Sequence, residues 1–304
     1  MRGSLGKLGS VLGLVAVLLV APLGWLLAHL PTELGLWSGR RIGDLLWVAL
    51  PKRRAVTLEN LRLAFAGEPE AERRRLGRRS FEHLGMNIVE SCVFFFRPPS
   101  VLLSRVELGD PDPVLAAAAQ GKGILGLTAH YGNWELLAAS HELSVFPLSV
   151  VVRPLDNPII DRLIERFRQR SGVELIGKRR ALPEILGALQ RGRIVGILLD
   201  QNASRAEGVF VPFFGVPAST SKAMALISLR TGAPVVPIFI RRIEGGRHRV
   251  EAGAAISPPL DGDVTEYTAA FNRSIESAIR RAPEQWFWMH NRWKTQPVGE
   301  IEVA

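Results

Sequence analysis

Short apolar runs alternate with amphipathic stretches from residue 121 onward. Each run is bounded by Gly, Pro or charged residues, and the runs cover 124–128, 148–152, 173–176, 194–199 and 235–240. The stretches between and after them predict helices over 156–170, 180–190, 220–231 and 264–281. Strands that alternate with helices favour right-handed crossovers. We therefore expect an α/β fold with a mostly parallel central sheet flanked by helices.

The N-terminal residues have a different pattern. From Leu8 to Thr32 there are 25 residues without Asp, Glu, Lys or Arg. A helix of that length, rising about 1.5 Å per residue, is longer than the roughly 30 Å hydrocarbon core of a bilayer. The run is also long for a cleaved signal peptide. We expect a retained transmembrane anchor over residues 1–34. The alternative is a buried core helix, although core helices rarely run this long without a polar face.

Basic residues are more frequent after this run than before it. Arg2 and Lys7 precede the run, whereas five basic residues follow it between positions 40 and 54. Because basic residues are enriched on the cytoplasmic side of membrane segments, this bias predicts that the rest of the chain lies in the cytoplasm.

Residues 35–115 are expected to form a helical, membrane-associated region. Trp37 and Trp47 lie near Arg40 and Arg41, a combination that suits a segment in the headgroup layer or an ordinary amphipathic helix packed on the domain. Apolar residues recur at helical spacing between positions 70 and 96. Since no linker or repeat follows, residues 116–304 are expected to form one α/β domain.

Composition narrows the class of partner. Lys and Arg total 38 and Asp and Glu 29, which gives a net charge of +9 and favours membrane headgroups, phosphates, nucleic acid or an acidic carrier protein. A single cysteine excludes a disulfide framework and a Cys-rich zinc site. The six histidines contain no H-E-x-x-H motif, so no metal site is expected. Five arginines between positions 73 and 79 could bind nucleic acid, but beside a membrane anchor a headgroup-facing basic surface is the better explanation.

Polar residues with catalytic potential follow the first predicted strand. Ligands of open parallel sheets bind at the carboxyl ends of the strands, and His130 and Glu135 come just after residue 128. His130 could accept a proton, while Glu135 could fix its tautomer and stabilise the imidazolium. Gly132 permits the tight turn between them. A purely structural histidine is the alternative.

Further polar residues follow the later strands. Arg153 could bind a phosphate or support an oxyanion, or it could form an ion pair with a neighbouring aspartate. Asn157 could hold a substrate oxygen or cap the helix that follows. Asp200 could orient Arg153 or Lys222, or cap the end of its strand. The tryptophans near the C-terminus are expected to pack in the core or to anchor at an interface.

Five ordered segments resemble the membrane-bound lipid A late acyltransferases, the lauroyl and myristoyl transferases of Gram-negative bacteria. Together they extend the resemblance over nearly the whole chain. They are the His-x4-Glu sequence at 130–135, the Arg-x-x-x-Asn sequence at 153–157, Asp200-Gln201, the Phe-Phe-Gly loop at 212–215 with Ser219 and Thr220, and the Trp-rich block at 283–293.

The resemblance implies a glycerolipid-acyltransferase-like fold without metal or tightly held cofactor. It implies transfer of a fatty acyl chain from a thioester, usually on acyl carrier protein, to a hydroxyl of a lipid A precursor at the inner membrane. His130 and Glu135 would be the catalytic residues. The expected substrate-binding residues are Arg153, Asn157, Asp200, Gln201, Thr220 and Lys222.

Direct attack on the thioester fits the sequence better than an acyl-enzyme route. No Gly-x-Ser-x-Gly elbow occurs, and Cys92 lies in a predicted helix away from the motif. Three alternatives stay open: a coenzyme A thioester as the donor, another glycolipid such as a phosphatidylinositol mannoside as the acceptor, and a non-catalytic membrane adaptor that retains the fold.

Overall fold

A computed structural model describes residues 21–152, 172–177 and 181–297. In this part of the chain, a seven-stranded sheet has the order β1-β9-β8-β2-β5-β3-β4. Its strands are β1 (Val106–Leu108), β2 (Ile124–Thr128), β3 (Leu148–Val152), β4 (Glu174–Gly177), β5 (Ile194–Leu198), β8 (Val235–Arg242) and β9 (His248–Ala252).

The pairing of these strands confirms the mostly parallel sheet expected from the sequence. Only β8 and β9 pair antiparallel in this sheet, while the other five pairings are parallel. A separate antiparallel hairpin is formed by β6 (Gly208–Phe213) and β7 (Val216–Ser221). The sequence analysis did not predict this hairpin or strands β1 and β9.

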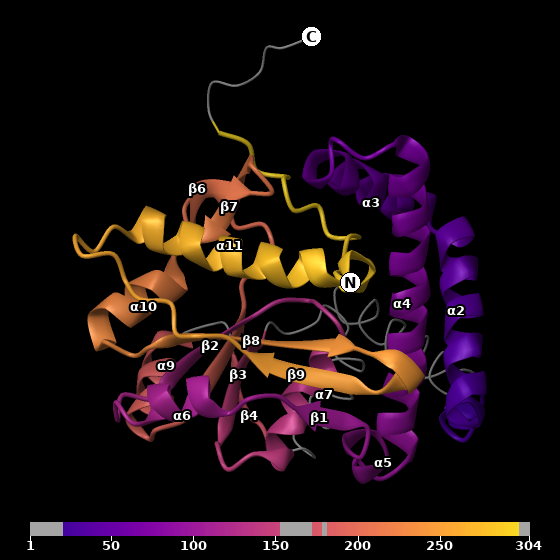
Figure 1. Ribbon diagram of the computed structural model, residues 1–304, viewed down its shortest axis with the longest axis horizontal. Helices are drawn as coiled ribbons and strands as arrows, with labels where there is room; N and C mark the ends of the chain where they lie inside the picture. Colours follow the sequence, from indigo (N-terminus) through magenta and orange to yellow (C-terminus); the bar gives the residue numbers. More distant parts are fainter. Residues whose placement is uncertain (1–20, 153–171, 178–180, 298–304) are drawn as a thin grey trace, which may run out of the picture.

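Helices cover both faces of the sheet (Figure 1). The alternation of side chains along a strand sends Leu125 and Leu127 of β2 into the main core. There they meet α9 (Ala181–Gln190), α10 (Ala223–Thr231) and α11 (Val264–Arg281). The opposite face is covered by α6 (Asp112–Ala118), α7 (Trp134–Ala139) and the short helices α5 (Ser100–Leu103) and η1 (Ser140–Leu143).

Most predicted helices agree with the structure at or near their bounds. The helix expected over 264–281 coincides with α11, and α9 begins one residue after the expected position 180. The helix expected from residue 220 begins at Ala223 instead, because residues 220 and 221 pair with β6 as the end of β7. The helix expected over 156–170 lies outside the described residues.

Three long helices that come before the sheet in the chain pack at one end of it (Figure 1). They are α2 (Thr32–Ala49), α3 (Pro51–Ala64) and α4 (Glu70–Phe96). Glycines bring α2 and α4 together: a Cβ on Gly85 would lie 2.0 Å from the Gly39 carbonyl oxygen, and one on Gly43 would lie 2.3 Å from that of Phe81. The backbones therefore touch directly. The remaining short helices are η2 (Glu244–Gly246) and η3 (Pro283–Gln285).

Within the described residues, no helix is both long and apolar enough to cross a bilayer. Residues 21–28 are helical, but positions 1–20, which hold much of the predicted anchor, lie outside the description. The anchor and the domain boundaries therefore stay predictions.

Candidate active site

The loop after β2 carries the candidate base. His130 lies two residues beyond the end of β2, and α7 starts at Trp134. Gly132 between them has φ +63°, and a Cβ there would lie 1.9 Å from the carbonyl oxygen of Ile240. Only glycine fits this position. Asn133 is the N-cap of α7, and its side chain accepts a hydrogen bond from the Leu136 amide at 3.1 Å.

Asp200 binds the histidine from the neighbouring strand. His130 Nδ1 lies 2.9 Å from Asp200 Oδ1, and the His130 backbone amide donates to Oδ2 at 3.0 Å. The Trp286 indole also donates to Oδ2, at 2.7 Å. The Asp200 side chain is 2% exposed and the imidazole 23%. Burial raises the pKa of Asp200, but the neighbouring His130 and these hydrogen bonds outweigh it, so the pKa lies below its usual value.

These contacts assign the tautomer of His130. A carboxylate can only accept hydrogen bonds, so the proton lies on Nδ1 and the lone pair on Nε2. The Gln201 amide nitrogen, which can only donate, lies 3.4 Å from Nε2. His130 is therefore ready to accept a proton at Nε2 and to become an imidazolium beside a buried negative charge.

Asp200 makes a contact with Nδ1 of His130 that was not expected from the sequence. The reason for this contact is strand register: Thr128 of β2 pairs with Leu198 of β5, so residues 130 and 200 both lie two positions beyond paired residues. The roles expected for Asp200, orienting Arg153 or Lys222 or capping its strand, stay predictions. Glu135 lies in the first turn of α7 and is half-buried. Its role stays a prediction.

The other predicted residues are placed differently. Arg153 and Asn157 lie outside the described residues. Thr220 is fully buried in β7, where its hydroxyl accepts a hydrogen bond from Arg292 at 2.5 Å, while Lys222 precedes α10. The structure thus brings Gln201 and Asp200 to His130, and the substrate-binding roles of the set stay predictions.

The Trp-rich block near the C-terminus closes over the loop. Core packing is confirmed for Trp286, Trp288 and Trp293, each at most 3% exposed. In addition, Trp286 binds Asp200, and the Phe287 amide donates to the His130 carbonyl at 3.0 Å. These contacts were not expected from the sequence, because the block lies far along the chain from His130 and Asp200 and its residues show no helix or strand periodicity.

An apolar pocket opens on the face of the sheet that α7 covers. Its wall includes Thr128 and Trp134, which flank the histidine in sequence, and the Trp134 ring lies edge-on to the imidazole at 5.2 Å. Gly126 of β2 and Gly196 of β5 pair in register and line the pocket. A Cβ on Gly196 would be no closer than 3.7 Å to any neighbouring atom. The absence of side chains at Gly126 and Gly196 leaves room for a long apolar group in this pocket, whose wall includes the Trp134 ring that contacts the imidazole.

Sequence comparison identifies the family to which the chain belongs. The model of the bacterial lipid A biosynthesis acyltransferase family matches residues 7–295. The chain belongs to this family, and it is a lipid O-acyltransferase that acts in lipid A biosynthesis.

Individual relatives agree with this assignment. The chain is 31% identical to the lipid A biosynthesis palmitoleoyltransferase of Escherichia coli (strain K12) over 284 residues, which cover 92% of this chain and 91% of the relative. Identity to the lipid A biosynthesis lauroyltransferase of the same organism is 33% over 279 residues, 90% of each chain. A phosphatidylinositol mannoside acyltransferase of Mycolicibacterium smegmatis (strain ATCC 700084 / mc(2)155) is 25% identical over 209 residues, 65% of this chain and 67% of the relative.

Proposed function

We propose that this enzyme moves a fatty acyl chain from acyl carrier protein to a hydroxyl of a lipid A precursor, with His130 as the general base. The observation that carries this proposal is the pairing of His130 Nδ1 with buried Asp200, which supports Nε2 as the base. The Trp134 ring, which contacts the imidazole, forms part of the wall of an apolar pocket. An acceptor hydroxyl needs such a base, and a fatty acyl chain needs such a pocket.

The reaction proceeds by direct attack. Nε2 takes the proton of the acceptor hydroxyl as its oxygen attacks the thioester carbonyl, which forms a tetrahedral oxyanion. The intermediate collapses with loss of the thiolate of the carrier, and the imidazolium returns its proton to that sulfur. Asp200 stabilises the imidazolium throughout, at a distance of 2.9 Å. Cys92, whose pKa burial raises, lies on α4 and is a poor nucleophile.

The remaining predicted residues have supporting roles in this scheme. Glu135 acts with His130 at the start of α7, and Gln201 lies against Nε2. Arg153 is proposed to bind the oxyanion or a substrate phosphate. Asn157, Thr220 and Lys222 complete the proposed substrate-binding set.

We also propose that the enzyme works at the cytoplasmic face of the inner membrane, with residues 1–34 as anchor, 35–115 as membrane-associated helices and 116–304 as the catalytic domain. The exposed face of α2 supports this arrangement. Leu34, Trp37, Leu45 and Val48 are 46–69% exposed on the side opposite its glycine contact, and exposed Arg41 lies among them. Apolar side chains with a nearby arginine suit the headgroup layer.

Mass spectrometry of envelope lipids from cells with and without the gene tests the acceptor. Loss of one secondary acyl chain from lipid A is the expected result. Loss of acyl groups from a phosphatidylinositol mannoside instead would favour the second acceptor, since one relative carries that name.

Radiolabelled acyl transfer by the full-length protein tests the base. Replacement His130→Ala should lower the rate by at least ~100-fold, the usual scale for a general base. Parallel reactions with acyl carrier protein and coenzyme A thioesters identify the donor. Unchanged transfer by the variant would contradict catalysis by His130, and no transfer by the wild type would favour an adaptor.

A further inference from the structure

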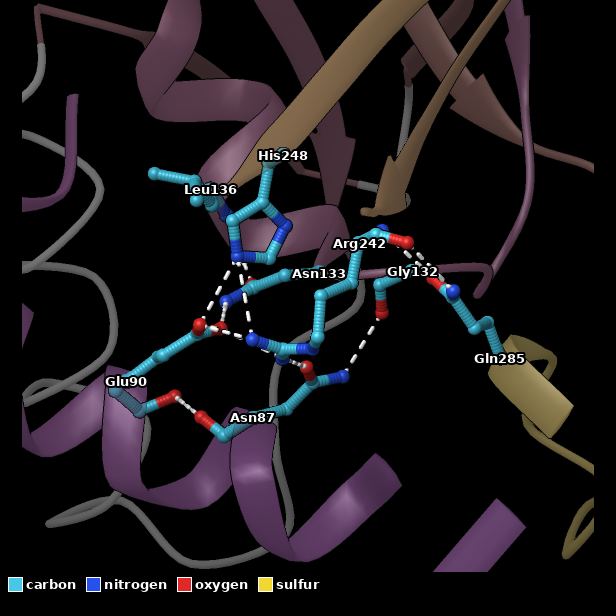
Figure 2. Close-up of polar contacts among 9 residues, drawn as sticks. Asn87, Glu90, Gly132, Asn133, Leu136, Arg242, His248 and Gln285 are labelled. Carbon is cyan, nitrogen blue, oxygen red and sulfur yellow. Dashed lines mark hydrogen bonds and ion pairs between the residues drawn. The ribbon is translucent and has the colours of Figure 1, made fainter. Parts of the chain in front are cut away.

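A cluster of buried charged residues contacts Asn133, which belongs to the loop between His130 and Glu135 (Figure 2). Glu90 of α4 and Arg242 at the end of β8 form an ion pair whose side chains are 5% and 8% exposed. Arg242 Nη1 binds Oε1 of the carboxylate, and Nη2 binds Oε2 at 2.9 Å. His248 Nε2 also lies 2.9 Å from Oε1. Burial raises the pKa of Glu90, but Arg242 and His248 outweigh it and hold the pKa well below the usual value.

Desolvation makes such an ion pair poor evidence for a gain in stability. Its neighbours indicate another role. Glu90 and Arg242 are 152 positions apart in the chain, and Glu90 also binds Asn133. Asn87 binds the neighbouring Gly132. Both loop residues lie between His130 and Glu135.

Glu90 fixes the orientation of the Asn133 amide. Asn133 Nδ2 donates to Glu90 Oε2 at 2.7 Å, and a carboxylate accepts hydrogen bonds but cannot donate them. The amide must therefore present its nitrogen to Glu90. Its oxygen is then left for the Leu136 amide, so the cap of α7 depends on the charge of Glu90.

Arg242 fixes a second amide in the opposite sense. Arg242 Nη2 donates to Asn87 Oδ1 at 2.7 Å, and a guanidinium can only donate. Asn87 must therefore present its oxygen to Arg242, and its nitrogen donates to the Gly132 carbonyl at 2.8 Å. The other side of the glycine is held as well, because its amide donates to the carbonyl oxygen of Gln285 at 3.0 Å. The Gln285 side chain in turn bonds both backbone groups of Arg242.

We propose that the Glu90–Arg242 ion pair, acting through Asn133 and Asn87, is the positioning device of the His130–Glu135 loop. The inference rests on the proposed function, in which this loop carries the base. A displacement of about 1 Å at a reacting group can cost about 100-fold in rate. The ion pair therefore acts on catalysis without touching the substrate.

The replacement Asn133→Ser separates the cap from the connection to Glu90. Serine caps helices about as well as asparagine, but its hydroxyl cannot bind the Leu136 amide and reach the carboxylate together. We expect kcat for acyl transfer to fall about 10- to 100-fold with KM for the acyl donor unchanged. The melting temperature should shift by only a few degrees.

Glu90→Gln tests the charge itself, and Glu90→Asp should recover part of the lost kcat because it restores the acceptor. Glu107→Gln is the matched control. Glu107 also forms ion pairs, with Arg247 and Arg249, but its side chain is 30% exposed and it lies on the edge strand β1. This control should have the kcat of the wild type.

Hydrogen–deuterium exchange of the full-length protein provides a readout that needs no substrate. Asn133→Ser and Glu90→Gln should speed exchange in residues 130–137, while β2 and α4 keep the protection of the wild type. Wild-type kcat together with unchanged loop exchange in folded Asn133→Ser would overturn the proposal. So would a loss of kcat that only follows global unfolding.

These measurements also separate the inference from the proposed function. If the wild type transfers no acyl group to any acceptor, the proposed function fails, yet loop exchange still decides whether the ion pair holds the loop. If Glu90→Gln does not fold, Asn133→Ser decides, because it leaves the ion pair intact.

Discussion

The replacement Asp200→Asn tests the assignment of the orienting acid. Asp200 accepts three hydrogen bonds, one at Oδ1 from His130 Nδ1 and two at Oδ2, from the His130 amide and Trp286. Asparagine has one oxygen. It satisfies most donors when that oxygen replaces Oδ2, which turns its NH2 toward Nδ1. Nδ1 must then accept, so Nε2 carries the proton and cannot act as the base.

The expected loss can be worked from the contact distance. In Asp200→Asn, the imidazolium formed in the reaction no longer has a carboxylate charge about 4 Å away. The attraction between two such charges is about 4 kcal/mol at an effective dielectric constant of 20. Since each 1.36 kcal/mol is a factor of ten, kcat should fall by about 10³-fold. A buried aspartate in a Ser-His-Asp triad has an effect of about 10⁴-fold, of similar size.

Single-turnover transfer of a radiolabelled acyl group measures this loss without interference from product release. KM for the donor should stay near the wild-type value, because Asp200 is buried behind the histidine. Asp263→Asn is the matched control: this aspartate is an exposed N-cap of α11, a position that asparagine fills equally well. Wild-type activity of Asp200→Asn, with a 10³-fold loss in Glu135→Gln, would refute the reasoning and make Glu135 the orienting acid.

Three further outcomes follow from the structure. Gly196→Leu should fill the apolar pocket and shift donor preference toward shorter chains, with about 1 kcal/mol for each methylene lost; the same chain-length profile as the wild type would exclude this pocket as the acyl site. Gly132→Ala should lower kcat and the melting temperature together, since its Cβ would overlap the Ile240 carbonyl; equal values in both assays would contradict the fixed turn. Stability should be complete above about pH 5 and decline as pH falls through the acid range, because Asp200 and Glu90 have lower pKa values when folded than when unfolded; thermal melts across that range that show no decline would exclude this linkage.

The sequence predicted the buried strands well. Strands β2 and β3 were expected at their observed bounds, because strands covered on both faces are short continuous apolar runs. The hairpin β6–β7 was missed, since prolines face each other in its pairing at positions 212 and 217 and interrupt the pattern. Strand β9 was missed because Arg249 and Glu251 leave no continuous apolar run in it.

The sequence located His130, Asp200 and Gln201 as site residues but not the contacts between them. Asp200 reaches His130 because β5 is the neighbour of β2, although β3 and β4 lie between them in the chain. A sequence of alternating strands and helices does not reveal that order. Glu90 was also beyond reach, since a carboxylate within the apolar stripe of a helix gives no sign of an arginine 152 residues later.

The closure of the Trp-rich block over the loop has a consequence for synthesis in the cell. Trp286, Phe287 and Gln285 supply hydrogen bonds to Asp200, His130 and Gly132. They are translated 86 residues after Asp200 and more than about 150 residues after His130 and Gly132. A ribosome-bound chain that has completed β5 still lacks these bonds. The contacts of His130 and Asp200 are therefore complete only after residue 287 has been translated, and a chain that stops before this residue should transfer no acyl group.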